Sequence, residues 1–288
     1  MKKRLSTKLG LFLYTIIVLL LILTIWTVWS NTALMVSSIT ILSNHVPAAF
    51  SGFRIAQVSD LHNAEFGENN SKLLNLLSEN EPDVIAITGD LVDARHTNIE
   101  VALDFVKRAT QIAPVYFVTG NHEASLLQYD DLSAGLEMAG AVVLEDEAIQ
   151  LERGDSKIII IGLADPDFAI KGDLFGEVPA MVSTKLNQLV NTEKGYTILL
   201  SHRPELFETY VSSGAELVFS GHAHGGQFRL PIIGGLIAPN QGLFPQYDAG
   251  VYSDGNTNMV ISRGIGNSII PFRFNNRPEV VLVELMTE

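Results

Sequence analysis

The chain of 288 residues contains no cysteine, and this absence excludes several kinds of protein at once. Without thiols there are no disulfides, no thiolate zinc sites and no cysteine nucleophiles. Basic residues are also scarce, because 19 lysines and arginines stand against 32 aspartates and glutamates, which gives a net charge of −13. An acidic chain of this kind repels a phosphate backbone, so we expect no nucleic-acid partner.

Charge is missing altogether from residues 9–29, a run rich in leucine and isoleucine. A helix of this length, with about 1.5 Å of rise per residue, spans roughly 30 Å, the thickness of the hydrocarbon core of a bilayer. Trp26 and Trp29 lie near its far end, where indole rings favour the membrane interface. The sequence therefore predicts a transmembrane anchor over residues 9–29.

The short segment 1–8 before this run predicts the orientation of the chain. It carries four basic residues and no acid, which holds such a segment in the cytoplasm. We therefore expect a single-pass protein of the cell membrane whose remaining chain is extracytoplasmic. The alternative is a cleaved signal peptide, but the apolar region of those peptides is usually only about 7–15 residues long. A weak cleavage site at Asn31-Thr32-Ala33 keeps that alternative open.

Beyond the anchor, residues 30–49 are expected to form a stalk and a first strand, and residues 50–288 a single domain. Within that domain, helical patterns at 71–79, 99–110 and 132–139 alternate with short apolar runs. Strands separated by helices of about ten residues predict an α/β domain with parallel strands. The segment 225–250 is rich in glycine and proline and is expected to be a long ordered loop. The apolar runs lie at residues 53–58, 84–88, 115–119, 158–163, 196–200, 217–219, 259–261 and 280–285.

Five polar blocks directly follow five of these apolar runs. Because open α/β sheets bind ligands beyond the carboxyl ends of their strands, we expect the blocks to converge at one edge. Of the seven histidines in the chain, only His45 and His96 lie outside the blocks. Structural histidines scattered through a core would not be distributed in this way. The blocks contain Asp60 and His62, Asp90, Asn121 and His122, His202, and His222 with His224.

Aspartate, asparagine and histidine side chains supply the oxygen and nitrogen donors that suit Mn, Zn or Fe. Two such divalent ions about 3.5–4 Å apart can hold the attacking and leaving oxygens of a phosphoryl displacement and acidify a bound water. We expect Asp90 to bridge two metal ions, one also bound by Asp60, His62 and His224, the other by Asn121, His202 and His222.

The order Asp-x-His, Gly-Asp, Gly-Asn-His-Glu, His, Gly-His-x-His resembles the calcineurin-like metallophosphoesterases, over a region from about residue 50 to the C-terminus. Segments 53–62, 262–266 and 277–279 resemble the small bacterial membrane-associated branch of that family. The resemblance implies a four-layer α/β/β/α sandwich of two packed sheets flanked by helices. It also implies the metal sharing described above, and a role for His122 in protonating the leaving oxygen.

In some members of the family, an aspartate three residues after the bridging one orients this histidine, and Asp93 occupies that position here. The protein Ser/Thr phosphatases continue with Arg-Gly, whereas this chain has Ala94 and Arg95. The difference argues against a protein phosphatase.

These observations favour a membrane-anchored binuclear-metal phosphoesterase that hydrolyses phosphodiester or pyrophosphate bonds. A lipid-linked or envelope substrate is favoured by the anchor and by the apolar character of segment 225–250. One alternative is a phosphomonoesterase that acts on soluble extracellular esters. Another is a non-catalytic binding protein stabilised by metals, but such a protein would not need His122, a proton donor outside the ligand set. The substrate, the native metals and the oligomeric state stay open at this point.

Overall fold

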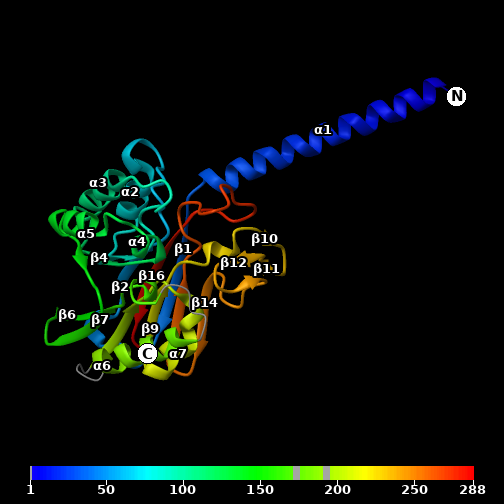
Figure 1. The fold of residues 1–288 in the computed structure, drawn as a ribbon. Helices are drawn as coiled ribbons and strands as arrows, with labels where there is room; N and C mark the ends of the chain where they lie inside the picture. Colours follow the sequence, from blue (N-terminus) through cyan, green and yellow to red (C-terminus); the bar gives the residue numbers. More distant parts are fainter. Residues whose placement is uncertain (1, 171–175, 191–194) are drawn as a thin grey trace.

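A computed structural model describes residues 2–170, 176–190 and 195–288, with side chains from residue 8 onward. Its first helix, α1 (Lys2–Thr32), projects away from the rest of the molecule (Figure 1). Within Lys8–Thr32 the most apolar 18 residues of this helix have a mean hydropathy of 2.6, and the helix is long and apolar enough to cross a membrane. A signal sequence near the N-terminus would meet the same criteria, so the helix is a candidate membrane span.

The rest of the chain forms two six-stranded mixed sheets. The first sheet is parallel except for the antiparallel pairing of β16 with β2. The second is parallel at its centre and has an antiparallel hairpin at each edge. The first has the order β1 (Met35–Leu42), β16 (Glu279–Met286), β2 (Phe53–Val58), β3 (Val84–Thr88), β4 (Val115–Val118), β5 (Val142–Val143). The second has the order β14 (Gly250–Asp254), β15 (Thr257–Ile261), β9 (Leu217–Ser220), β8 (Tyr196–Leu200), β7 (Ser156–Gly162), β6 (Glu147–Arg153).

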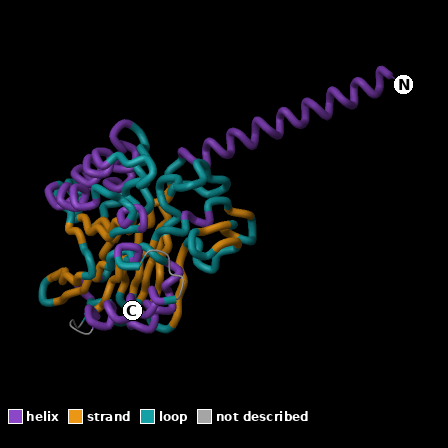
Figure 2. Tube along the Cα trace, viewed as in Figure 1, coloured by secondary structure: helices purple, strands orange, loops and turns teal. Residues whose placement is uncertain are grey.

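Helices cover the two sheets on the faces that point away from each other (Figures 1 and 2). The first sheet carries α2 (Ser71–Glu79), α3 (Ile99–Ala109) and α5 (Tyr129–Met138). The second carries α6 (Glu177–Val190) and α7 (Phe207–Ser213). Shorter helical turns are α4 (Asn121–Ala124), η1 (Ala48–Phe50), η2 (Glu68–Asn70), η3 (Pro166–Phe168), η4 (Pro204–Leu206) and η5 (His224–Gly226).

Three buried hydrophobic clusters hold these layers together, one between the sheets and one under each set of helices. Alternate residues of each strand supply different clusters, because successive side chains point to opposite faces. In β2, Phe53 and Ile55 face the other sheet, whereas Ala56 and Val58 face the helices. The predicted α/β class with two packed sheets is confirmed, and the clusters follow the order of helix, sheet, sheet and helix that a four-layer sandwich requires.

The segment 30–49 contributes β1, which pairs in parallel with the C-terminal strand β16 at the edge of the first sheet. The segment expected to be one long loop contains two small antiparallel hairpins, β10 (Arg229–Leu230) with β11 (Gly234–Gly235) and β12 (Ile237–Ala238) with β13 (Gly242–Leu243). We call residues 229–244 the hairpin lobe. It lies on the side of the domain from which α1 projects (Figure 1).

The last turn of α1 is joined to the domain by specific contacts. The Asn31 side chain donates to the carbonyl of Arg273 (2.9 Å) and accepts from its N–H (2.8 Å). The Arg277 guanidinium donates to the carbonyl of Ala33 (2.8 Å) and lies 4.8 Å from the centre of the Trp29 ring. The end of α1 is therefore an ordered part of the domain surface.

Candidate metal centre and active site

The proposed ligands all lie in the turns that follow β2, β3, β4, β8 and β9. Five of the seven have a positive φ, which residues other than glycine seldom adopt and which is frequent at functional sites. The values are 54° at Asp60, 47° at His62, 52° at Asp90, 64° at His222 and 48° at His224.

Two glycines allow these turns to approach one another closely. A Cβ atom on Gly120 would lie 2.7 Å from the backbone nitrogen of Asp90, and one on Gly221 would lie 2.6 Å from Asp60 Oδ2. Both distances are too short for a carbon atom. Glycine is therefore required before Asn121 and His222 for reasons of packing.

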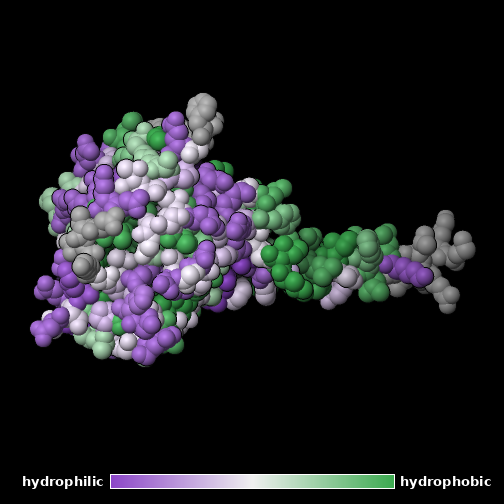
Figure 3. All heavy atoms as spheres, turned by 90° about the horizontal axis from the view of Figure 1, so that it is seen from below, coloured by the Kyte–Doolittle hydropathy of each residue, from purple (hydrophilic) through white to green (hydrophobic). Residues whose placement is uncertain are grey.

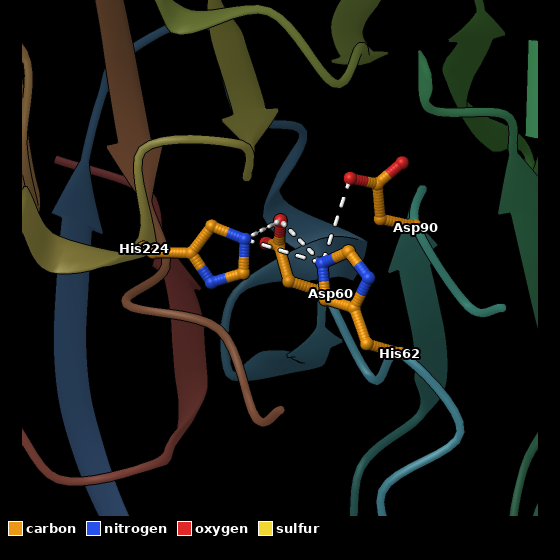
Figure 4. Close-up of side chains that lie close together, drawn as sticks. All are labelled: Asp60, His62, Asp90 and His224. Atoms are coloured by element: carbon orange, nitrogen blue, oxygen red, sulfur yellow. Dashed lines mark hydrogen bonds and ion pairs between the residues drawn. The ribbon is translucent and has the colours of Figure 1, made fainter. Parts of the chain in front are cut away.

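The first group of ligand atoms belongs to Asp60, His62, Asp90 and His224, and these atoms lie within 4.8 Å of one another. Figure 4 shows the four side chains pointing toward a common centre. His62 Nε2 is 3.2 Å from His224 Nε2 and 3.6 Å from Asp90 Oδ2, and His224 Nε2 is 3.3 Å from Asp60 Oδ1. All four side chains are buried.

The second group comprises Asp90, His202 and His222. His202 Nε2 lies 3.2 Å from Asp90 Oδ2 and 3.1 Å from His222 Nδ1. On its other side, His202 Nδ1 donates to the carbonyl of Thr88 over 2.7 Å, since a carbonyl can only accept. This hydrogen bond leaves Nε2 directed at Asp90, the arrangement typical of a metal-bound histidine. Asp90 thus belongs to both groups.

Several features of these residues fit bound divalent metal ions. Asn121 Oδ1 is buried and has no hydrogen-bond partner among the described residues. Two pairs of histidine nitrogens face each other at 3.1–3.2 Å, one pair in each group. A buried oxygen without a partner is costly, and a cation bound between these atoms would satisfy it.

The electrostatics favour the protonation states that metal ligands need. Burial lowers the pKa of His62 to about 3 and holds the pKa values of His222 and His224 well below the ordinary value. Burial raises the pKa of the Asp90 carboxyl, but the charges of His202 and other nearby histidines and a hydrogen bond with His202 together outweigh burial, so this pKa lies well below its ordinary value. Two ligands are exceptions. Burial raises the pKa of Asp60 to about 6, and burial lowers the pKa of His202 while Asp90, with Asp60 and Asp165, raises it to about 10. A metal ion must displace that proton in order to bind.

His122 and Asp93 lie beside the first group, within 4.8 Å of His62. His122 Nδ1 accepts a hydrogen bond from the Ala94 N–H (3.0 Å), whereas the nearest Asp93 oxygen is 3.6 Å away. The Asp93 carboxylate is instead bound by the Arg95 guanidinium at 2.7 Å. The hydrogen bond that orients the His122 ring therefore comes from the backbone of Ala94, with Asp93 as a close negative charge.

Glu123 belongs to the sequence motif, but the sequence analysis assigned it no role. Its buried carboxylate accepts hydrogen bonds from the N–H groups of Asp90 (2.8 Å), Gly120 (2.7 Å) and Val92 (3.2 Å). Glu123 therefore fixes the turn of Asp90 to α4. Glu123 lies three residues after the N-cap Gly120, where a glutamate side chain can accept from the N-cap N–H.

An ion pair that the sequence analysis missed also supports the site. The Arg203 guanidinium binds Asp165 through two hydrogen bonds of 2.6 and 2.7 Å, and its Nη1 lies 3.4 Å from His222 Nε2. Asp165 follows β7 just as the proposed ligands follow their strands, so the same strand-end rule would have found it.

Two hollows flank the metal centre. A polar pocket of about 410 Å³ lies on the His222 side and is lined in part by Asp167, Arg203, Glu205 and Asn240. An apolar groove of about 240 Å³ lies on the other side, where His224 forms part of its lining.

Two packed α/β sheets, with two groups of buried ligands sharing one carboxylate at their edge, define a class of metal-dependent hydrolase. Residues 53–226 match the family described as calcineurin-like phosphoesterase, and the chain belongs to this family. It is a metal-dependent phosphoester hydrolase, and the expected resemblance is confirmed.

Relatives and solved structures agree with this assignment. The uncharacterized metallophosphoesterase YkuE of Bacillus subtilis is 28% identical over 250 residues, which cover 85% of this chain and 83% of that protein. The phosphodiesterase YaeI of Escherichia coli is 28% identical over 242 residues, or 81% of this chain and 82% of that protein. The crystal structure of TT1561 from Thermus thermophilus shares the fold, with a TM-score of 0.52 at 15% identity over 74% of this chain and 90% of its own.

Proposed function

We propose that the chain is a membrane-anchored enzyme that uses two divalent metal ions to hydrolyse phosphodiester or pyrophosphate bonds. The observation that carries this proposal is the presence of Asp90 in both ligand groups. A carboxylate shared in this way suits two cations held close together. When two cations are bound, they can hold the attacking and leaving oxygens and lower the pKa of the attacking water. The ions are expected to be Mn, Zn or Fe.

The ligand assignment follows the two groups. One ion would be held by Asp60, His62 and His224 with Asp90, and the other by His202 and His222 with Asp90. The partnerless Asn121 Oδ1 supports Asn121 as a further ligand of the second ion.

His122 is proposed to donate the proton to the leaving oxygen. Its ring centre lies 4.5 Å from that of His62, at the edge of the first ligand group. For Asp93, burial raises the pKa, but hydrogen bonds from Arg95 lower it to about 2, so the carboxylate is charged at neutral pH. That charge lies 3.6 Å from His122 Nδ1. An alkoxide or phosphate leaving group needs such a proton donor.

The proposed location is the outer face of the cell membrane, with a lipid-linked or envelope phosphoester as the substrate. The apolar helix from Lys8 to Thr32 and the basic residues before it support the anchor and its orientation. A relative from Danio rerio that is 26% identical over 83% of this chain and 54% of its own length is named a transmembrane protein with a metallophosphoesterase domain, which supports membrane attachment. The relative YaeI is named a phosphodiesterase, and this supports a phosphodiester substrate for the present chain.

The experiment that tests the metal assignment measures bound metal and the rate of phosphodiester hydrolysis for the full chain in detergent. We expect close to two ions per chain, loss of hydrolysis on chelation, and recovery with Mn or a related ion. Asp90→Ala should lose both ions and more than about 100-fold in kcat, since even outer-shell partners of a metal contribute roughly 10–100-fold.

Asp60→Ala should be less damaging than Asp90→Ala, because Asp60 serves one ion. The control is Asp104→Ala, which removes a partly exposed carboxylate that pairs with Arg108 on α3. Full activity in metal-free protein would contradict the two-metal mechanism. Greater metal loss in Asp60→Ala than in Asp90→Ala would show that the bridge is wrongly assigned.

A further inference from the structure

The apolar groove beside His224 lies between the hairpin lobe and the loop before Arg273. Ile237, Ala238 and Pro239 form one wall, and residues 268–270 form the other. Segments 230–247 and 264–272 contain no charged residue, although the chain as a whole is strongly acidic. The groove is therefore an uncharged hollow that opens next to a proposed metal ligand.

Amide side chains hold one wall of the groove and the turn at His224 in place. Gln227 Nε2 donates to the carbonyls of Ile270 (2.9 Å) and Phe272 (2.7 Å). Asn276 Nδ2 donates to the carbonyls of His224 (2.8 Å) and Gln227 (3.2 Å). Because these side-chain N–H groups satisfy the backbone carbonyls, the carbonyls need no hydrogen bond from a ligand. The surface that faces the groove is therefore mainly apolar. Pre-formed hollows lined by apolar side chains are typical ligand sites.

Exposed apolar side chains continue from the groove onto the surface. We call them the apolar rim. Figure 3 shows hydrophobic side chains gathered on the domain where α1 leaves it. Single exposed hydrophobic residues are ordinary, but a group of them marks a surface that binds a partner or a membrane. The rim consists of Ile232, Ile233, Leu243, Phe244, Ile269 and Phe272.

The position of α1 identifies what the rim and groove meet. Asn31, in the last turn of α1, is hydrogen-bonded to the backbone of Arg273, which directly follows the loop that carries Ile269 and Phe272. A bilayer that surrounds α1 therefore reaches the domain beside this loop. One wall of the groove is therefore adjacent to the membrane end of α1.

The hairpin lobe also connects the groove to the polar pocket. Ile237 and Pro239 line the groove, whereas Asn240 lines the polar pocket, where its side-chain nitrogen lies 3.3 Å from His222 Nε2. The metal centre thus lies between an apolar hollow and a polar one. A ligand that fills both the groove and the polar pocket needs a hydrocarbon part, a polar part and a phosphoester between them, next to the metal centre.

We propose that the groove binds the hydrocarbon chain of an amphiphilic phosphoester taken from the membrane, with its head group in the polar pocket. This inference rests on the proposed function and specifies its substrate class. In the reaction, a water oxygen bonds to phosphorus as the P–O bond to the leaving group breaks, and the leaving oxygen receives a proton.

The test compares methyl, butyl and octyl nitrophenyl phosphodiesters with the full chain in lipid nanodiscs. Each buried methylene should raise kcat/KM about fourfold until the groove is filled. Ile269→Asp should lower kcat/KM for the octyl ester at least about tenfold and leave the methyl ester within twofold, because burying a charge against a chain is costly. Ile269 is 80% exposed, so the substitution should not disturb folding.

The matched control is Met138→Asp, at the end of α5, where the side chain is 90% exposed and outside the rim. This variant should behave like the wild type with all three esters. Equal kcat/KM for the methyl and octyl esters in the wild-type protein, or equal losses in the two variants, would overturn the proposal.

A second measurement does not depend on turnover. An octyl phosphonate with a diazirine at the end of its chain should label residues 237–239 or 268–270 of the domain, and Ile269→Asp should reduce that label. Labelling of Leu127 and Met138 as strongly as the groove would overturn the proposal. If no ester is hydrolysed but the groove is labelled, the proposed function fails and the chain-binding site stands.

Discussion

The hydrogen bonds of His122 decide what this side chain can do. In the neutral ring, Nδ1 accepts from the Ala94 N–H, so the hydrogen is on Nε2. To act as an acid the ring must also be protonated at Nδ1, and that N–H then needs an acceptor. Asp93 Oδ1, 3.6 Å away, is the nearest charged candidate, although Arg95 also binds it. The charged ring is therefore expected to exchange its contact with Ala94 for one with Asp93.

His122→Ala should keep both metal ions while kcat falls by about 10²–10⁴, the usual contribution of positioned proton transfer. The loss should depend on the leaving group. A nitrophenolate departs without much help, so an activated diester should lose far less than an alkyl phosphodiester or a pyrophosphate. The measurement is kcat and bound metal for one substrate of each kind.

Asp93→Asn serves as the matched variant, because it removes the charge beside His122 and keeps the shape of the side chain. It should show a milder form of the same dependence on the leaving group. Loss of metal in His122→Ala, or equal losses on both substrates, would mean that His122 is a ligand or a scaffold residue.

At the residue scale, the proposed metal ligands could be found from the sequence more readily than the residues that hold those ligands in place. Asp60 and His222 could be found because each follows a strand, and the end of a parallel strand fixes where its next residues lie. Glu123 and Arg203 were not assigned roles because their partners are distant in sequence. Glu123 binds the backbone of Asp90, 33 residues earlier, and Arg203 binds Asp165, 38 residues earlier. The pairings themselves leave no local pattern, although Asp165 follows the strand β7 and Glu123 also binds the nearby N–H of Gly120.

At the scale of elements, the last turn of α1 and the loop 267–273 form one unit. The Arg273 side chain is fully buried and donates to the carbonyls of Arg263 and Gly266. Its Nη2 lies 3.4 Å from His224 Nδ1. A chain of contacts therefore runs from Asn31 through Arg273 to a proposed metal ligand, and the same loop forms one wall of the apolar groove.

Asn31→Ala should loosen this unit. The substitution removes both hydrogen bonds to the Arg273 backbone, and leaving buried polar groups without partners costs about 1–3 kcal/mol each. We expect faster amide hydrogen exchange in residues 267–273, a lower unfolding temperature and a larger KM for the octyl ester, with both metals retained. Thr32→Val is the control, because the Thr32 hydroxyl bonds within α1, to the Val28 carbonyl. Unchanged exchange in the loop of Asn31→Ala would contradict this coupling.

The strands buried on both faces could be predicted from the sequence. Every residue of β3 and of β8 is buried, so each reads as a continuous apolar run. The edge strand β6 was missed because most of its residues are partly or fully exposed and it carries Glu152 and Arg153. The hairpins of segment 225–250 were missed because each strand has only two residues. Their pairing depends on turns, which apolar periodicity does not reveal.

At the scale of the whole molecule, charge and apolar surface are separated. The acidic residues belong almost entirely to the domain, whereas the segment before the membrane run is basic. Exposed apolar side chains cover α1, and a group of them forms the rim beside its end (Figure 3). An acidic domain repels anionic lipid head groups, so the proposed anchor and the rim are the parts that can hold it close to a bilayer.

The orientation of the chain can be tested directly. Basic residues next to a membrane helix stay in the cytoplasm, so the domain should be outside. Protease added to intact protoplasts should therefore digest the domain while a cytoplasmic marker protein survives. Replacing Lys2, Lys3, Arg4 and Lys8 by glutamine should reduce the fraction that is digested, because the charge that fixes the orientation is then lost. Protection of the unaltered domain until lysis would place it in the cytoplasm. A mature protein that begins near Ala33 would instead indicate a signal peptide, and it would also lack the Asn31 contacts with Arg273.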